Sequence, residues 1–355
     1  ARMAAAGLEA LLVSDLTNIR WLTGFSGTNG WVVLDADSLT LVTDGRYGEQ
    51  AAKQMAAAGV PGEVLIGATG ADTLAHLAAL CGRHGRVGFE AEHVSYAVHG
   101  RWAAAFAAEL QPAHGVVEAA RRVKDDAEID AMARACAIAD EALAEVAPHL
   151  EGLTEAEVRN RLEARMRALG ATGPSYETIV ATGPLNAALP HHRPTDTVIE
   201  AGHTVIIDVG ALVGGYHSDM TRTFVIGKPS AEQQHLYEVV LAAQRAGVAA
   251  VQAGLSVKQL DAVCRDIIAE AGYGDWFTHG TGHGVGLLIH EDPFVNRAGD
   301  AILQVGDVVT VEPGVYREGF GGIRVEDLVV VTSDGCRVLT ASPKDSPCPP
   351  SPPTT

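Results

Sequence analysis

The segment HTVIIDVGALVGGYHSDMTRTFVIG (203–227) contains two runs of mainly β-branched and apolar residues, HTVIIDVGALV (203–213) and TRTFVIG (221–227). Such runs, bounded by glycines and polar residues, are typical of β-strands. Asp208 directly follows the apolar residues of the first run, and Asp219 lies eleven positions further along. Because an unpaired charge at the end of a buried strand is costly, Asp208 is expected to have a specific partner.

The sequence that follows shows the same combination of apolar runs and isolated acids. DVVTVEP (307–313) and IRVEDLVVVT (323–332) predict two more strands, which contain Glu312 and Glu326. Helices are expected between the strands, at 231–252 and 257–271. The motif HGTGHG (279–284) contributes His283, and its glycines predict a flexible loop in which the backbone can approach a ligand closely.

These motifs supply four carboxylates and one imidazole, a donor set that is rich in oxygen. Any one of these acids alone would be read as an ordinary carboxylate at the end of a strand. Four carboxylates gathered without four cations need divalent metal ions to neutralise them, and the set is too hard for a structural zinc site. Two ions that share carboxylates and a bridging water, roughly 3.5–4 Å apart, are the natural arrangement, and this water can supply hydroxide near neutral pH. The predicted reaction class is metal-assisted hydrolysis.

The rest of the chain predicts an α/β (α+β) protein with two domains and a tail. Residues 1–120 alternate predicted strands (10–14, 31–35, 39–43, 86–90) with predicted helices (49–59, 71–82, 95–110). The second domain, 121–342, opens with a long amphipathic helix up to 146, and Thr154 and Glu157 form a capping-box pattern at the start of the next helix. Residues 343–355 form a Pro/Ser-rich tail, either disordered or packed on the surface. No internal repeat is evident.

Composition excludes several classes of partner. The chain has 26 Lys and Arg against 44 Asp and Glu, a formal net charge of −18, which argues against binding to nucleic acid. No apolar stretch approaches the roughly 18 residues of a membrane-spanning helix, so no membrane association is expected. The five cysteines are scattered without paired spacing, which favours reduced thiols and a cytoplasmic location.

In their order and context, the five residues resemble the ligands of the pita-bread metallopeptidases, in the branch of Xaa-Pro dipeptidases (prolidases) and aminopeptidases P. The motifs are VIIDVGA (205–211), HSDMTRTF (217–224), GHGVGL (282–287), VEPGVY (311–316) and RVED (324–327). NIRWLTGFSG (18–27) and TDGRYGEQA (43–51) resemble the N-terminal domain of that branch. The resemblance implies a small mixed-sheet N-terminal domain, a pita-bread C-terminal catalytic domain and a homodimer.

The resemblance also implies a role for each ligand. Asp208 would hold one ion, His283 and Glu312 the other, and Asp219 and Glu326 would bridge the two. Glu312 would also contact the bridging hydroxide and act as general base. The two divalent ions are expected to be manganese, with cobalt or zinc as alternatives.

Four further residues have roles that the resemblance implies. His191 and His290 would flank the scissile bond, where imidazoles can stabilise a tetrahedral oxyanion and protonate the leaving nitrogen. His279 is a predicted substrate-binding residue, as is Arg324, which would orient the bridging carboxylates. His192 is read as an ordinary neighbour without a role.

The predicted function is that of an Xaa-Pro dipeptidase acting on short proline-containing peptides, with aminopeptidase P as the alternative. Some prolidases have an arginine for the dipeptide carboxylate four residues after the residue matching His290, where this chain has Phe294. Arg46 is the favoured replacement, ahead of Arg193 and Arg20. Methionine aminopeptidases share the ligands but typically lack an N-terminal domain, and creatinase lacks the ligands. A catalytically inactive peptide-binding relative is the remaining alternative.

Overall fold

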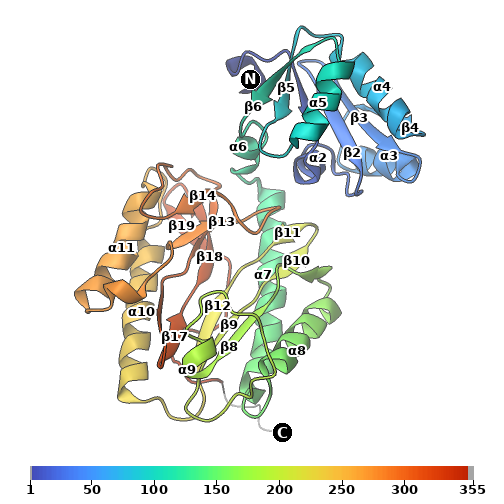
Figure 1. Ribbon diagram of the computed structural model, residues 1–355. Coiled ribbons are helices and arrows are strands. Elements are labelled where there is room, and N and C mark those ends of the chain that lie inside the picture. Colours follow the sequence, from blue (N-terminus) through green and yellow to red (C-terminus); the bar gives the residue numbers. More distant parts are fainter. Residues whose placement is uncertain (1, 351–355) are drawn as a thin grey trace. The chain divides into compact units, whose positions relative to one another are not determined.

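The computed structural model describes residues 2–350, and the chain divides into two compact units (Figure 1). The N-terminal unit extends to Arg121 and the C-terminal unit starts at Arg122. Within residues 2–350, no helix is both long and apolar enough to cross a membrane.

The N-terminal unit is built on a six-stranded sheet with the strand order β4-β3-β2-β1-β5-β6. Strand β2 runs antiparallel to both neighbours and the other neighbouring pairs are parallel. The five strands other than β2 therefore end at the same edge of the sheet. The bounds of the strands are β1 Ala10–Val13, β2 Gly30–Leu34, β3 Leu39–Asp44, β4 Glu63–Gly67, β5 Arg86–Glu90 and β6 Glu109–Ala113.

Helices cover both faces of this sheet. All four residues of β1 are buried, and alternate residues belong to different clusters: Leu11 packs with Met55 on one face, and Leu12 with Leu77 on the other. The helices are α1 Arg2–Ala5, α2 Leu16–Thr23, α3 Gly48–Ala57, α4 Gly70–Cys81, α5 Tyr96–Ala105 and α6 Glu118–Arg121. The helix predicted at 95–110 is too long, because the chain turns extended at Phe106 and then forms edge strand β6.

Four long helices flank the strands of the C-terminal unit, with α7 and α8 on one side and α10 and α11 on the other (Figure 1). Both α8 and α11 begin with a capping box, at Thr154 and Ser256, which satisfies the first free backbone N–H groups. The bounds of the helices are α7 Asp126–Val146, α8 Glu155–Ala168, α9 Gly183–Asn186, α10 Ala231–Ala250 and α11 Val257–Glu270, with short 3₁₀ turns at Ala147–His149 and Gly274–Trp276.

The strands of the C-terminal unit form small antiparallel sheets. Two three-stranded sheets have the orders β12-β9-β8 and β11-β10-β7, a five-stranded sheet has the order β14-β13-β15-β18-β19, and β16 pairs with β17. The bounds are β7 Gly173–Pro174, β8 Ile179–Thr182, β9 Thr204–Asp208, β10 Ala211–Val213, β11 Tyr216–His217, β12 Thr221–Val225, β13 Gly282–Gly284, β14 Glu291–Val295, β15 Val308–Val311, β16 Gly314–Arg317, β17 Gly321–Arg324, β18 Asp327–Thr332 and β19 Gly335–Val338.

Two predicted strands are interrupted where the chain carries an acid. The run 203–213 divides into β9, which ends at Asp208, and β10, because Gly210 packs so closely on Ser218 that a Cβ would lie 1.9 Å from the Ser218 carbonyl oxygen. The run 323–332 divides into the end of β17 and β18, and Glu326 lies in the break between them. Asp208 is thus the last paired residue of β9, and Glu326 lies between two strands.

The part of the Pro/Ser-rich tail that the structure describes packs against the C-terminal unit. Tyr237 donates its hydroxyl proton to the Lys344 carbonyl oxygen (2.9 Å), and the backbone N–H of Val225 donates to the carbonyl oxygen of Pro347 (2.7 Å). The remainder, 351–355, lies outside the described residues.

Candidate metal centre

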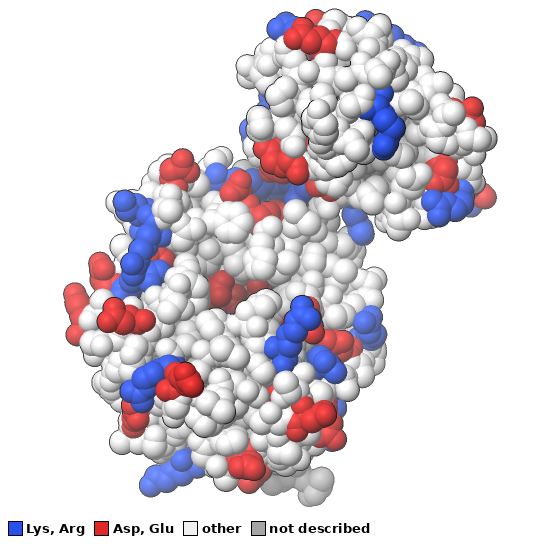
Figure 2. All heavy atoms as spheres, in the orientation of Figure 1, with Lys and Arg blue, Asp and Glu red and all other residues white. Residues whose placement is uncertain are grey.

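A cavity of about 400 Å³ in the C-terminal unit, the metal-site cavity below, brings most of the predicted site residues together. It is lined by nine of them, Asp208, Asp219, His283, Glu312, Glu326, His191, His279, His290 and Arg324, and also by Phe294. On the face that Figure 2 shows, acidic side chains lie recessed in a hollow of this unit. Of the described residues that were predicted to bind substrate, Arg46 does not line this cavity.

The five predicted ligands come from segments that are distant in sequence. Asp208 ends β9, and antiparallel pairing places Thr221 of β12 opposite it, so that Asp219 arrives just before this pair. His283 is the central residue of β13. Glu312 directly follows β15, and Glu326 precedes β18, the strand that pairs with β15. The strand pairings thus deliver all five side chains to one cavity.

The side chains are close enough to share an ion. One ligand atom each of Asp219, His283 and Glu326 lie within 4.8 Å of one another. The Nε2 atom of His283 lies 3.5 Å from Asp219 Oδ2 and 3.3 Å from Glu312 Oε1. The Nδ1 atom of the same ring is 3.1 Å from the Gly284 carbonyl oxygen, to which it can donate its proton, leaving a lone pair on Nε2 for a metal.

Two of the carboxylates are in an environment that disfavours their charge. Asp219 and Glu326 are 4% and 1% exposed, and burial raises the pKa of both carboxyl groups well above the ordinary range. Repulsion adds to burial: the charge of Asp208 raises the pKa of Asp219, and the charge of Asp219 raises that of Glu326. The positive charge of Arg324 lowers the pKa of Asp219, but burial and the neighbouring carboxylates outweigh it.

The residues therefore fit divalent metal ions. A cluster of buried carboxylates with one correctly oriented imidazole is a donor set for hard or intermediate divalent cations, and such ions would supply the positive charge that the cluster lacks. Thr221 donates to Glu326 Oε2 (2.6 Å), and Thr310 to Glu312 Oε1 (3.1 Å), so both carboxylates are oriented by hydroxyl groups behind them.

Arg324 is fixed entirely by protein groups. Its guanidinium donates to Asp208 Oδ2 (2.7 Å), to the Tyr316 hydroxyl (2.7 Å) and to Thr221 Oγ1 (2.9 Å). His279 continues this network: its Nε2 lies 3.0 Å from the Tyr316 oxygen and its Nδ1 2.7 Å from the Gly280 carbonyl oxygen. Burial lowers the pKa of His279, so both ring nitrogens of a neutral imidazole are engaged within the protein.

Tyr176 is a site residue that sequence reasoning missed. Its hydroxyl oxygen lies within hydrogen-bonding distance of carboxylate oxygens of both Asp208 and Asp219, 2.5 Å from Asp219 Oδ1, so its single proton can be donated to either acid. Its side chain lines the metal-site cavity. Burial and the charges of these two acids raise the pKa of its hydroxyl. It lies in GPSYET, a segment without periodicity or a metal-ligand motif, so only its contacts reveal it.

His191 and His290 line the same cavity and are exposed to solvent. The rings of His290 and His283 meet edge to face with their centroids 4.4 Å apart, and burial followed by repulsion from His283 lowers the pKa of His290. His192, by contrast, is buried, and its Nε2 lies 2.9 Å from Glu155 Oε2. Glu155 also accepts hydrogen bonds from Thr195, so this acid, also missed, ties down the segment that carries His191.

Arg46 and Arg20 belong to the N-terminal unit, whereas Arg193 belongs to the C-terminal unit. The Arg46 guanidinium lies 2.9 Å from Asp44 Oδ2 and remains largely exposed. Arg193 is also exposed and lies 3.4 Å from Glu177, which lines the metal-site cavity.

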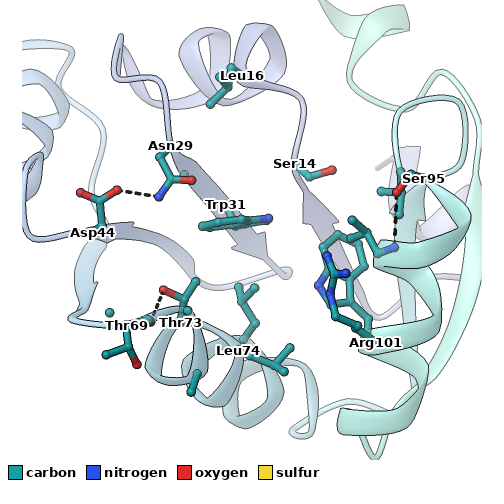
Figure 3. A pocket seen from close by; sticks show the side chains of 18 of the residues that line it. Ser14, Leu16, Asn29, Trp31, Asp44, Thr69, Thr73, Leu74, Ser95 and Arg101 are labelled. Carbon is teal, nitrogen blue, oxygen red and sulfur yellow. Dashed lines mark hydrogen bonds between the residues drawn. The ribbon is translucent and has the colours of Figure 1, made fainter.

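The N-terminal unit has a cavity of its own, the N-terminal cavity, of about 1030 Å³ (Figure 3). It lies at the edge of the sheet where β1, β3 and β4 end, and Trp31 and Leu74 supply part of its apolar lining. Asn29 donates to Asp44 at its edge (Figure 3). Among the described residues, the one cluster suited to a metal ion is that of Asp219, His283 and Glu326, in the other unit.

Fold and site together define a class of protein: a hydrolytic metalloenzyme with a carboxylate-rich centre in its C-terminal unit. Comparison with known families agrees, since residues 130–333 match Metallopeptidase family M24 and residues 1–123 match the Creatinase/Prolidase N-terminal domain. The chain belongs to metallopeptidase family M24 and is a hydrolase of a family that uses divalent metal ions. The predicted family and the predicted pairing of an N-terminal domain with a metallopeptidase domain are confirmed.

The relatives include enzymes that act on Xaa-Pro bonds. The chain is 42% identical over 238 residues to the Xaa-Pro dipeptidase of Pyrococcus furiosus, covering 67% of this chain and 68% of the relative. The solved Xaa-Pro dipeptidase from Bacillus anthracis is 40% identical, with a TM-score of 0.93 over 97% of this chain and 96% of that one. The X-Pro aminopeptidase from Thermotoga maritima is 34% identical, with a TM-score of 0.89 over 97% and 98%.

Proposed function

We propose that the protein is an Xaa-Pro dipeptidase that hydrolyses the peptide bond before a C-terminal proline with the help of two divalent ions. The observation that carries the proposal is the cluster of Asp208, Asp219, Glu312 and Glu326 around His283 in a cavity of about 400 Å³. This volume is at the small end of the range for ligand pockets, roughly 300–1,000 Å³, which suits a short peptide.

The proposed ligands divide between two ions. Asp208 would hold one ion, His283 and Glu312 the other, and Asp219 and Glu326 both. When bound, the ions would polarise the scissile carbonyl group and lower the pKa of water so that it can attack at neutral pH. Manganese suits the oxygen-rich set, with cobalt or zinc as substitutes.

Side chains at the metal site are proposed to transfer protons and to orient the scissile bond. Glu312 is the proposed general base, and the hydroxyl of Thr310 holds one of its oxygens at 3.1 Å. Because the pKa of His290 is lowered, its imidazole is neutral near pH 7 and can accept a hydrogen bond from the peptide or pass on a proton. His191 is also exposed to the cavity and can interact with the other side of the scissile bond.

A bond before proline has a specific requirement. Its nitrogen is a tertiary amide without a proton of its own, so a proton must reach this nitrogen before it leaves as an amine. His191 and His290, which both line the cavity, are proposed to deliver this proton. Arg324 is not available, because the contacts to Asp208, Thr221 and Tyr316 occupy its guanidinium.

Restriction to dipeptides is supported by the relatives named Xaa-Pro dipeptidases. The restriction requires a cation for the free carboxylate of proline, and Arg46 is the proposed one. Phe294, 45% exposed in the cavity, offers an apolar surface for the pyrrolidine ring instead. Aminopeptidase P activity is the second candidate, favoured by the likeness to the Thermotoga enzyme and by the absence of an arginine at Phe294. The acting form is proposed to be a cytoplasmic homodimer.

The test compares hydrolysis of Ala-Pro, Ala-Pro-amide and Ala-Pro-Ala at equal concentration with manganese supplied. A dipeptidase prefers Ala-Pro to both other peptides, because only Ala-Pro presents a free proline carboxylate. Preference for Ala-Pro-Ala would establish an aminopeptidase P. Cleavage of none of the three, by a protein that binds manganese, would contradict both candidates and favour a peptide-binding role.

A further inference from the structure

A buried ion pair on helix α11 contacts residues 277–284, called the loop below, a segment that contains His279 and, in its short strand β13, His283. Asp261 and Arg265 are one helical turn apart, and the guanidinium makes two hydrogen bonds to the carboxylate: Nε to Oδ2 at 2.8 Å and Nη2 to Oδ1 at 2.9 Å. Asp261 is 1% exposed and Arg265 9%. Neither residue lines the metal-site cavity.

Both members of the pair bind the loop. Asp261 Oδ1 accepts hydrogen bonds from the backbone N–H of Thr281 (3.0 Å) and from its hydroxyl (2.9 Å). Arg265 donates to the carbonyl oxygens of Phe277 (3.0 Å) and His279 (2.7 Å), and its guanidinium stacks on the Phe277 ring, 4.0 Å from the centroid. Three residues of the loop are therefore held from one helix.

The contacts continue from the loop to a second ligand. Thr281, which is fully buried, accepts a hydrogen bond at its carbonyl oxygen from the backbone N–H of Glu312 (2.8 Å). Two residues further on, the backbone N–H of His283 donates to the Thr310 hydroxyl (3.0 Å), which in turn donates to Glu312 Oε1. The ion pair is thus connected to both ligands through Thr281.

The loop requires such an external restraint because it is rich in glycine. A Cβ at Gly282 would lie 2.1 Å from the Thr310 carbonyl oxygen, and one at Gly280 would lie 2.9 Å from that of Val295, so larger residues do not fit. Glycine gives close packing but leaves the free backbone flexible. A buried ion pair is a weak source of stability, because the cost of desolvation offsets the attraction between the charges. The role of this pair is therefore inferred from its contacts with the loop.

We propose that Asp261 and Arg265 are positioning residues that preorganise the loop of His283 and thereby set the affinity for metal. The inference rests on the metal centre of the proposed function but not on its substrate. Outer contacts that orient ligands typically change metal affinity about 10- to 100-fold when they are removed.

The test measures manganese binding to metal-free protein, without any peptide, together with thermal unfolding. Asp261→Asn removes the charge and keeps the size. Asp307→Asn is the matched control, because Asp307 is fully buried, is bound by Arg122 at 2.6 and 2.9 Å, and lies outside the metal-site cavity. Asp261→Asn is expected to weaken manganese binding about 10- to 100-fold, and Asp307→Asn to lower the Tm while leaving the affinity within about twofold.

Arg265→Lys provides the second variant if Asp261→Asn does not fold. A lysine keeps the charge, but its single ammonium group cannot bond Asp261 and both loop carbonyl groups as the planar guanidinium does. Manganese binding is therefore expected to be about tenfold weaker. Affinity within twofold of wild type in a folded variant, or equal losses in Asp307→Asn, would overturn the proposal. Failure to cleave Xaa-Pro peptides would leave this result unaffected, whereas a wild-type protein that binds no manganese would overturn the metal centre itself.

Discussion

The larger of the two cavities in this protein has the better compensated acid, and the smaller one has the uncompensated acids. The N-terminal cavity is larger, about 1030 Å³ against about 400 Å³. One of its acids, Asp44, pairs with the Arg46 cation and accepts a hydrogen bond from the neutral amide of Asn29, and both contacts lower the pKa of this carboxyl group. In the metal-site cavity, burial and mutual repulsion raise the pKa values of Asp219 and Glu326. Uncompensated charge, more than volume, therefore distinguishes the site of chemistry.

Removing one acid from each cavity should have the largest effect on turnover and should affect it in only one of the two cavities. Asp219→Ala or Glu326→Ala is expected to reduce turnover by more than about 100-fold, the upper range for loss of a group that only supports a ligand. Asp15→Asn in the N-terminal cavity keeps the cap of α2 and should leave turnover within about twofold. Steady-state rates with excess manganese provide the measurement, and a tenth of wild-type activity in Asp219→Ala would contradict the assignment.

A smaller change tests Tyr176 as a support of two ligands. Tyr176→Phe removes the hydroxyl that binds Asp208 and Asp219 and is expected to weaken manganese affinity about tenfold or more. Tyr216→Phe is the matched control in the same unit, since it removes a hydroxyl bonded to Glu128 at 2.7 Å. Equal affinities of the two variants, measured by calorimetric titration, would remove Tyr176 from the metal centre.

Arg46, in the N-terminal unit, is proposed to bind the substrate carboxylate and so to determine the preference for dipeptides. Arg46→Ala is expected to raise KM for Ala-Pro about tenfold, the cost of one charge-assisted hydrogen bond, and to spare Ala-Pro-Ala. Arg86→Ala serves as the control, because Arg86 is an exposed arginine of the same unit that pairs with Glu9 and lines neither cavity. If Arg46→Ala slowed both peptides alike, the carboxylate-binding role would pass to another cation.

The smallest expected effect is on the pH dependence of the stability of the metal-free protein. Because the pKa values of Asp219 and Glu326 are raised in the folded state, this state binds more protons than the unfolded chain above about pH 4. The contribution of these groups to the free energy of unfolding therefore falls as pH rises through that window. Asp219→Asn should melt above metal-free wild type at pH 8, with the difference shrinking towards pH 4.5. A difference independent of pH would contradict the raised pKa values.

Sequence reasoning singled out residues that are marked by their immediate neighbours, and the structure brings them into one cavity. Asp208 and Glu312 follow apolar runs and His283 lies among glycines, so their unusual setting is visible within a few residues. Tyr176, Glu155 and Asp261 could not be found this way. Each acts through contacts with segments at least twenty positions away, which only strand pairing and helix packing bring close.

A local likeness between helices α8 and α11 was also missed. Helices α8 and α11 each span 14 residues and start with a capping box. Their cap residues Thr154 and Ser256 form isolated β-bridges with Val198 and Ile302, respectively. The shared signal is only the cap and the Glu or Gln three residues later, too short to reveal a repeat.

The manganese stoichiometry of the folded protein shows whether the buried carboxylates hold two metal ions. Metal-free wild type, titrated by calorimetry and checked by elemental analysis, is expected to bind two ions per chain, and Asp219→Asn to lose tight binding of both. Wild-type protein that is folded but binds no manganese, cobalt or zinc would show that these carboxylates do not form a metal centre.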